Sequence, residues 1–227
     1  MGGKTDFLGI IGRFVVTSPL RSVCYAARHA PDVREAVAWI DRATAADLVS
    51  REEMREFAAG LDGMRGAGQC RRAIDWASEN CWTPTESAMR MILTLDLGIG
   101  GVVSNQPVFD GRGRHLGTPD LLDPVAGIAW EYDGEVHWRQ RAADLRRDSR
   151  FRAAGIETVS MVGADLGDPT DFVQRTELAY EAAARRPAGS AAWTVRAPQR
   201  WASTTTVERR RALDDRNRDR LLGWQVA

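Results

Sequence analysis

Lysine is almost absent from the chain, cysteine is scarce, and there is no long apolar run. Lys4 is the only lysine among 31 cationic residues, so arginine carries nearly all of the positive charge. The arginine fork suits phosphate. The three cysteines, Cys24, Cys70 and Cys81, have neither CxxC spacing nor neighbouring histidines. A disulfide framework or a zinc site is therefore not expected.

No apolar run approaches the roughly 18 residues that a membrane span needs. The apolar residues near the start of the chain are interrupted by Gly12 and Arg13, which does not fit a signal peptide. Hydrophobic residues make up 44% and charged residues 27% of the 227 residues, as in globular proteins. We expect a cytoplasmic protein of at most two modules, with no membrane partner.

The net charge of zero gives no overall attraction to nucleic acid, but the charge is unevenly distributed. Residues 187–227 hold eight arginines against four acidic residues, interleaved with Trp193, Trp201 and Trp224. This tail is open to two interpretations. It is either a DNA-contacting arm that combines phosphate contacts with base stacking, or a solvated helix docked by its tryptophans.

The most informative stretch is residues 117–137. A polar turn separates two short apolar runs, which read as paired strands. Asp120 lies on the first strand, and Glu131 and Asp133 lie two apart on one face of the second. Three carboxylates can thus converge at one sheet end, where only a cation makes their proximity favourable; hard oxygen ligands suit Mg²⁺ or Mn²⁺.

A purely structural interpretation also exists. Pro119-Asp120 is common in loops, and Asp133-Gly134 is an ordinary turn dipeptide. Glu131 favours the functional interpretation, because it follows an almost wholly apolar run in which an ionised carboxylate is costly unless it is paired or metal-bound.

An ordered set of motifs over roughly residues 83–168 resembles the PD-(D/E)XK nuclease superfamily. The motifs are Thr83-Pro84-Thr85-Glu86-Ser87, Pro119-Asp120, Glu131-Tyr132-Asp133-Gly134 with His137, Arg147-Asp148, and Gly155. The likeness is closest to the branch related to the very-short-patch mismatch-repair endonuclease, a domain also found at the C-terminus of actinobacterial AbiEi-like proteins of type IV toxin–antitoxin systems. Val15-Val16-Thr17-Ser18, Arg21-Ser22 and Arg28 resemble the middle region of those proteins, with Tyr25 at a position where they tend to carry Asp and without their winged helix.

The resemblance implies roles for individual residues. Asp120, Glu131 and the backbone carbonyl of Tyr132 would bind Mg²⁺ (or Mn²⁺). The superfamily's usual lysine is replaced by Asp133, so the proton-transfer role passes to Asp133 or His137. Glu86 is either a site carboxylate or only the capping-box residue of a helix that starts at Thr83.

Four arginines are candidates for contacts to DNA. Arg90, one turn after Glu86, could pair with it or reach a phosphate. Arg146, Arg147 and Arg150 lie on the helix expected after the carboxylates and could follow the DNA backbone, although Arg147 and Asp148 could simply form local ion pairs.

The expected fold is α/β: a restriction-endonuclease-like αβββαβ core with a mixed sheet, preceded by a small helical module. Its parts are the helical module, 1–82, the nuclease-like domain, 83–186, and the tail, 187–227, entered through a linker at 186–190. Helices are expected at 32–44, 50–61, 69–80, from 83, 138–154, 171–185 and 207–222, and strands at 14–17, 102–109, 115–122, 126–133 and 156–162. Trp39 and Trp76, on helices of the first module, are expected in its core.

The sequence thus favours a metal-dependent DNA endonuclease in repair, restriction or phage defence, with DNA as partner and a homodimer left open. The alternative is a non-catalytic AbiEi-like antitoxin or DNA-binding regulator that keeps the nuclease fold as a scaffold.

Overall fold

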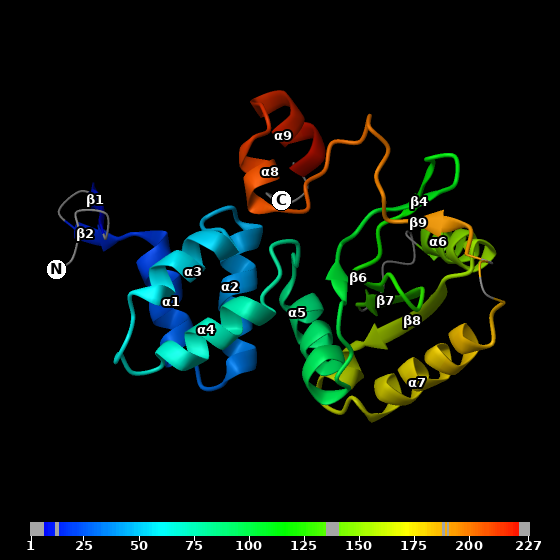
Figure 1. Cartoon of the computed structure of the whole chain (residues 1–227), viewed down its shortest axis with the longest axis horizontal. Helices are drawn as coiled ribbons and strands as arrows, with labels where there is room; N and C mark the ends of the chain where they lie inside the picture. Colours follow the sequence, from blue (N-terminus) through cyan, green and yellow to red (C-terminus); the bar gives the residue numbers. More distant parts are fainter. Residues whose placement is uncertain (1–6, 12–13, 135–140, 188, 190, 223–227) are drawn as a thin grey trace. The chain divides into compact units, whose positions relative to one another are not determined.

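The structure is a computed structural model that describes residues 7–11, 14–134, 141–187, 189 and 191–222; for 7–11, 14–15 and 141–146 it describes the backbone alone. The chain forms two compact units (Figure 1). The first comprises Met1–Pro84 and Ser203–Ala227, and the second comprises Thr85–Ala202. The arginine-rich tail is therefore divided between the units.

Helices dominate the first unit, as expected. An antiparallel pair of strands precedes four helices, and several helix starts are capped as their sequences predict. Ser50 and Glu53 form a reciprocal capping box at the start of the third helix. The elements are β1 (Phe7–Ile11), β2 (Phe14–Thr17), α1 (Pro19–His29), α2 (Val33–Ala45), α3 (Arg51–Ala59) and α4 (Ala67–Trp76).

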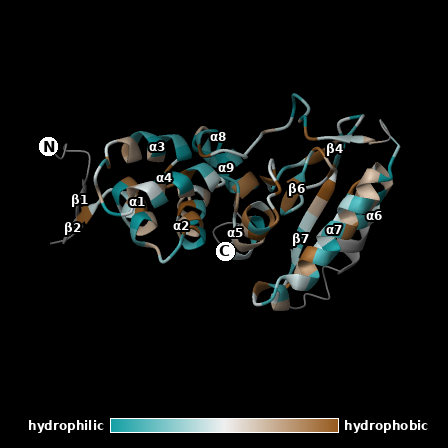
Figure 2. Cartoon of the chain, turned by 60° about the horizontal axis from the view of Figure 1, so that its bottom comes forward, coloured by the Kyte–Doolittle hydropathy of each residue, from teal (hydrophilic) through white to brown (hydrophobic). Residues whose placement is uncertain are grey.

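Trp39 and Trp76 are not core residues, so that expectation was wrong. They are 42% and 37% exposed. On α2 the buried face is made by Ala36, Val37 and Ile40, and Trp39 lies outside it with the Arg42 guanidinium 5.1 Å from its ring centre. Figure 2 shows both apolar and polar residues on α1 to α4, as amphipathic helices require.

The end of the tail folds onto the first unit as two short helices, α8 (Val207–Arg211) and α9 (Asp215–Leu222). Arg210 is completely buried. Its guanidinium donates to Asp47 Oδ1 at 2.7 Å and to the backbone oxygens of Thr44, Glu79 and Thr204 at 2.7, 2.9 and 2.9 Å. This part of the tail is docked, and the buried Arg210 anchors it; Trp224 lies outside the described residues.

A four-stranded mixed sheet with the order β3-β6-β7-β8 forms the centre of the second unit. β7 is antiparallel to β6 and parallel to β8, with α6 as the crossover helix. The elements of this sheet and its helices are α5 (Pro84–Met91), which continues into a π-helical turn (Ile92–Asp96), β3 (Val103–Ser104), β6 (Leu121–Asp123), β7 (Ile128–Asp133), α6 (Arg141–Ala154), β8 (Glu157–Val162) and α7 (Thr170–Ala184). The expected mixed α/β class is confirmed.

A second, small antiparallel sheet has the order β5-β4-β9. Two of the expected strands are in fact each split between the two sheets. Asn105 has a φ of 46° and Pro107 has no N–H, which ends β3 before β4 begins; Pro119 separates β5 from β6 in the same way. The strands of the small sheet are β4 (Val108–Asp110), β5 (His115–Gly117) and β9 (Trp193–Thr194).

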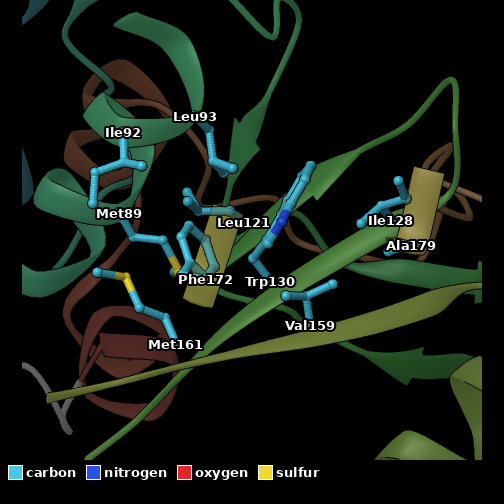
Figure 3. Close-up of a cluster of buried hydrophobic side chains, with 10 residues drawn as sticks. All are labelled: Met89, Ile92, Leu93, Leu121, Ile128, Trp130, Val159, Met161, Phe172 and Ala179. Atoms are coloured by element: carbon cyan, nitrogen blue, oxygen red, sulfur yellow. The ribbon is translucent and has the colours of Figure 1, made fainter. Parts of the chain in front are cut away.

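Apolar side chains cover both faces of the mixed sheet. Figure 3 shows the larger cluster, in which Trp130 of β7 and Met161 of β8 pack with residues of α5 and α7 such as Met89 and Phe172. The opposite face packs Leu122 and Ala129 against Phe151 of α6. The mixed sheet is thus covered by helices on both faces.

The expected linker at 186–190 begins with an anchored residue. Arg186 donates hydrogen bonds to the backbone oxygens of Gly155, Ala126 and Gly127.

None of the helices in the described part of the chain combines the length and the apolar character that a membrane span requires.

Candidate active site

Asp120 and Glu131 lie on the same face of the mixed sheet. Leu122 and Ala129 are antiparallel partners and both belong to the cluster under α6. Asp120 directly precedes β6 and Glu131 lies on β7, each two residues further toward the same end. Because side chains alternate along a strand, this spacing places both on that face as well. The Tyr132 backbone N–H donates to Asp120 Oδ2 at 2.8 Å, which ties the two strands together at this point.

Arg147 of α6 supplies the positive charge beside this carboxylate pair. Its Nη2 lies 3.2 Å from Glu131 Oε2, and Glu131 is only 9% exposed. Gly117 lets the helix approach this closely, since a Cβ there would lie 2.8 Å from Phe151 Cζ and 3.1 Å from Arg147 Cγ. A guanidinium thus neutralises part of the charge that a metal ion would otherwise neutralise.

Burial raises the pKa of Asp120 above its ordinary value, while the Tyr132 N–H and the charge of Arg147 act in the opposite direction. Desolvation is the largest of these effects, so the ionised carboxylate is under-compensated in the protein alone. A buried carboxylate with a raised pKa is a candidate site residue.

Asp133 follows on the same face of β7 but is exposed. Among the described side chains, no group of three or more His, Cys, Asp or Glu residues is close enough together to hold a metal ion. The described part of the site therefore offers a pair of carboxylates, Asp120 and Glu131, rather than the expected convergence of three. His137 lies outside the described residues.

Glu86 connects to this pair through Asn105, a residue that sequence reasoning missed. Glu86 is 4% exposed, and its Oε2 accepts a 2.6 Å hydrogen bond from Asn105 Nδ2. The backbone N–H of Asn105 donates to the Asp120 carbonyl at 2.8 Å. One signal in the sequence could have pointed to Asn105: it lies two residues before a proline. Asn tolerates the left-handed backbone conformation that Asn105 adopts here.

The four candidate DNA-binding arginines have different environments. Arg90 is only 5% exposed, so its burial does not fit a contact to phosphate. Arg147 is engaged with Glu131, and Arg150, one turn further along α6, is exposed. The side chain of Arg146 lies outside the described residues.

No family model, curated protein or solved structure matches this chain. The chemistry of the site is therefore argued from its own geometry. Two adjacent carboxylates on one sheet face, one of them under-compensated, can bind a hard divalent cation, and the arginine released by that cation can contact an anion.

Proposed function

We propose that this chain is a metal-dependent DNA endonuclease of the PD-(D/E)XK type, with its site at Asp120 and Glu131. The observation that carries the proposal is the pairing of these two carboxylates on one face of a buried sheet beside Arg147. A carboxylate pair of this kind is costly for stability alone, which favours a functional reason for it.

The donor set fits Mg²⁺ or Mn²⁺. Both are hard cations that accept carboxylate and carbonyl oxygens and keep several waters, so two protein carboxylates suffice. The Tyr132 carbonyl is a third candidate ligand. Its N–H donates toward Asp120, and the N–H and C=O of a strand residue face the same neighbouring strand.

The bound ion would lower the pKa of a coordinated water and stabilise charge on the scissile phosphate. Asp120 and Glu131 would hold it, and Arg147, once released from Glu131, would contact a phosphate oxygen. Asp133 is exposed two residues after Glu131 and can accept a proton there; His137 is the other candidate for this role. Glu86 would act through Asn105 as a residue that positions the Asp120 strand.

The test is incubation of the purified full chain with supercoiled plasmid, single-stranded DNA and mismatched duplex in Mg²⁺, Mn²⁺ or EDTA. Cleavage should require the metal and should fall by at least about 100-fold in Asp120→Asn and Glu131→Gln. Glu177→Gln, on the exposed face of α7, is the matched control and should cut normally.

Two observations favour a second function, a DNA-binding regulator without catalysis. Glu131 is already paired with Arg147, and among the described residues no third acidic side chain lies close enough to Asp120 and Glu131 to share a metal ion with them. Both are compatible with a retained scaffold. That function predicts DNA binding that is identical in metal and in EDTA, with no cleavage of any of the three substrates.

A further inference from the structure

A strongly basic surface surrounds the small sheet of the second unit. It is made by the β4–β5 hairpin, by the segment 195–202 that follows β9, and by one residue of α6. Its five exposed arginines are Arg112, Arg114, Arg150, Arg196 and Arg200. We call this the hairpin surface. Across residues 107–118 and 191–202 the sequence holds a single carboxylate, Asp110, although the whole chain has no net charge.

Asp110 pairs with Arg114 alone among these arginines, and the rest of its carboxylate is used to build the hairpin turn. Its Oδ1 accepts from the backbone N–H groups of Arg112 and Arg114, both at 2.9 Å, and its Oδ2 accepts from Arg114 Nε at 2.6 Å. These bonds lower the pKa of Asp110, and the hydrogen bond from the Arg114 backbone N–H has the largest effect. The turn therefore holds Arg112 at an exposed tip with its charge uncompensated.

Residues 195–202 are fastened to the same sheet. The Trp201 ring packs edge-on against Phe109, with ring centres 4.9 Å apart, and lies 4.9 Å from the His115 ring. Arg200 Nη2 lies 3.5 Å from the Gly113 carbonyl, which brings its charge beside the hairpin tip. Trp201 therefore holds residues 195–202 against the small sheet and does not form an open stacking surface. The groups of this surface that a partner can contact are arginines.

Arg150 brings the surface toward the candidate site. Arg150 lies on α6, which packs against the edge strand β5 at Gly117. Burial is the main cause that lowers the pKa of His115 on this strand, and the positive charge of Arg150 acts in the same direction. Asp120 lies five positions after His115 in the chain, a span of at most about 18 Å. A DNA duplex presents a phosphate charge every ~1.7 Å of its axis, so a single duplex can reach both places.

We propose that the hairpin surface binds the phosphate backbone of duplex DNA without reading its sequence. The inference rests on the proposed nuclease function, which makes DNA the expected polyanion. It names the part of the chain that holds this substrate. Fixed arginines with uncompensated charge supply binding through counterion release.

The experiment measures binding of a short random-sequence duplex by fluorescence anisotropy in EDTA, where cleavage cannot occur, at several salt concentrations. Arg112→Gln/Arg200→Gln in the full chain should weaken binding by roughly 10- to 100-fold at 0.1 M salt and reduce the log–log salt slope by about two. Arg112→Gln alone should reduce the slope by about one. Among the described residues the exposed Arg112 side chain has no hydrogen-bond or ion-pair partner, so this variant tests the surface without disturbing the fold.

The matched control, Arg72→Gln/Arg185→Gln, removes two exposed arginines from α4 and α7 and should leave affinity and slope unchanged. Equal affinities and slopes in the two double variants would overturn the inference, as would a parent protein that does not bind duplex at low salt. A protein that binds through this surface but cuts nothing in Mg²⁺ or Mn²⁺ would overturn the nuclease function alone. Metal-dependent cleavage with an unchanged salt slope in Arg112→Gln/Arg200→Gln would overturn only the hairpin surface.

Discussion

Asp120 is held in the protein at an energetic disadvantage near neutral pH. Its folded pKa is raised by burial above the ordinary value of 3.8. The folded state therefore binds this proton more tightly than the unfolded state. The contribution of Asp120 to the free energy of unfolding is fully present below pH 3.8, falls as the pH rises through the folded pKa, and stays low above it.

Replacement of Asp120 by Asn should accordingly stabilise the metal-free protein at pH 7. We expect a gain of roughly 1 kcal/mol, or about 2–4 °C in the thermal midpoint, because the amide removes an under-compensated charge. Mn²⁺ should raise the midpoint of the parent but not of this variant. Melting curves at pH 7 in EDTA and in Mn²⁺ measure both effects, and an equal metal response in the two proteins would contradict the site.

A metal ion at the proposed site would compete with Arg147 for Glu131, so Arg147→Met should enlarge the metal response. Without the guanidinium, Glu131 is left as a nearly buried charge, and the metal-free protein should lose about 1–3 kcal/mol. Mn²⁺ should restore most of this loss. Thermal midpoints with and without Mn²⁺, compared with the same pair for the parent, test the competition. A destabilised variant that responds to Mn²⁺ no more than the parent would mean that Arg147 is only structural.

At the scale of elements, the fully buried Arg210 of α8 makes several hydrogen bonds within the first unit, beside further contacts from Val207 and Arg211. Replacing Arg210 with Met removes hydrogen bonds to Asp47 and to three backbone carbonyls, and we expect a loss of about 3–5 kcal/mol. Arg216→Met, on the exposed start of α9, is the control and should change stability by less than about 0.5 kcal/mol. Urea unfolding of the two variants decides the point, and equal midpoints would refute the role of Arg210.

Local signals in the sequence were sufficient for most helices and for the central strands. Ser50 and Glu53 predicted the capping box at α3, and the apolar run before Glu131 predicted β7. Long-range geometry was not readable in the same way. Pro107 and Pro119 are visible in the sequence, but which sheet each strand fragment joins depends on residues far away, such as Thr194 pairing with Phe109.

The same limit applies to the site. Asp120 and Glu131 were predictable as neighbours because Asp120 directly precedes β6 and Glu131 lies on the adjacent strand β7. The partner of Glu131 was not, since the sequence left Arg147 with either Asp148 or phosphate and the structure pairs it with Glu131. Asn105 and Gly117 act through backbone conformation and close packing, for which one sequence carries only weak signals.

At the scale of the whole molecule, the proposed metal site and the hairpin surface both belong to the second unit. Metal binding should therefore slow amide exchange in residues 120–133 and 141–154 of the parent protein and leave 19–76 unchanged. Hydrogen exchange followed by mass spectrometry, with and without Mn²⁺, measures this, and Asp120→Asn serves as control. Uniform slowing across both units would contradict a local site.

The most direct test of the account is the position of the metal itself. Anomalous scattering from crystals of the full chain grown with Mn²⁺ should give one strong peak about 2.0–2.2 Å from carboxylate oxygens of both Asp120 and Glu131, with the Arg147 guanidinium moved away from Glu131. An intact Arg147–Glu131 ion pair, with no peak between the two carboxylates at saturating Mn²⁺, would contradict the central claim.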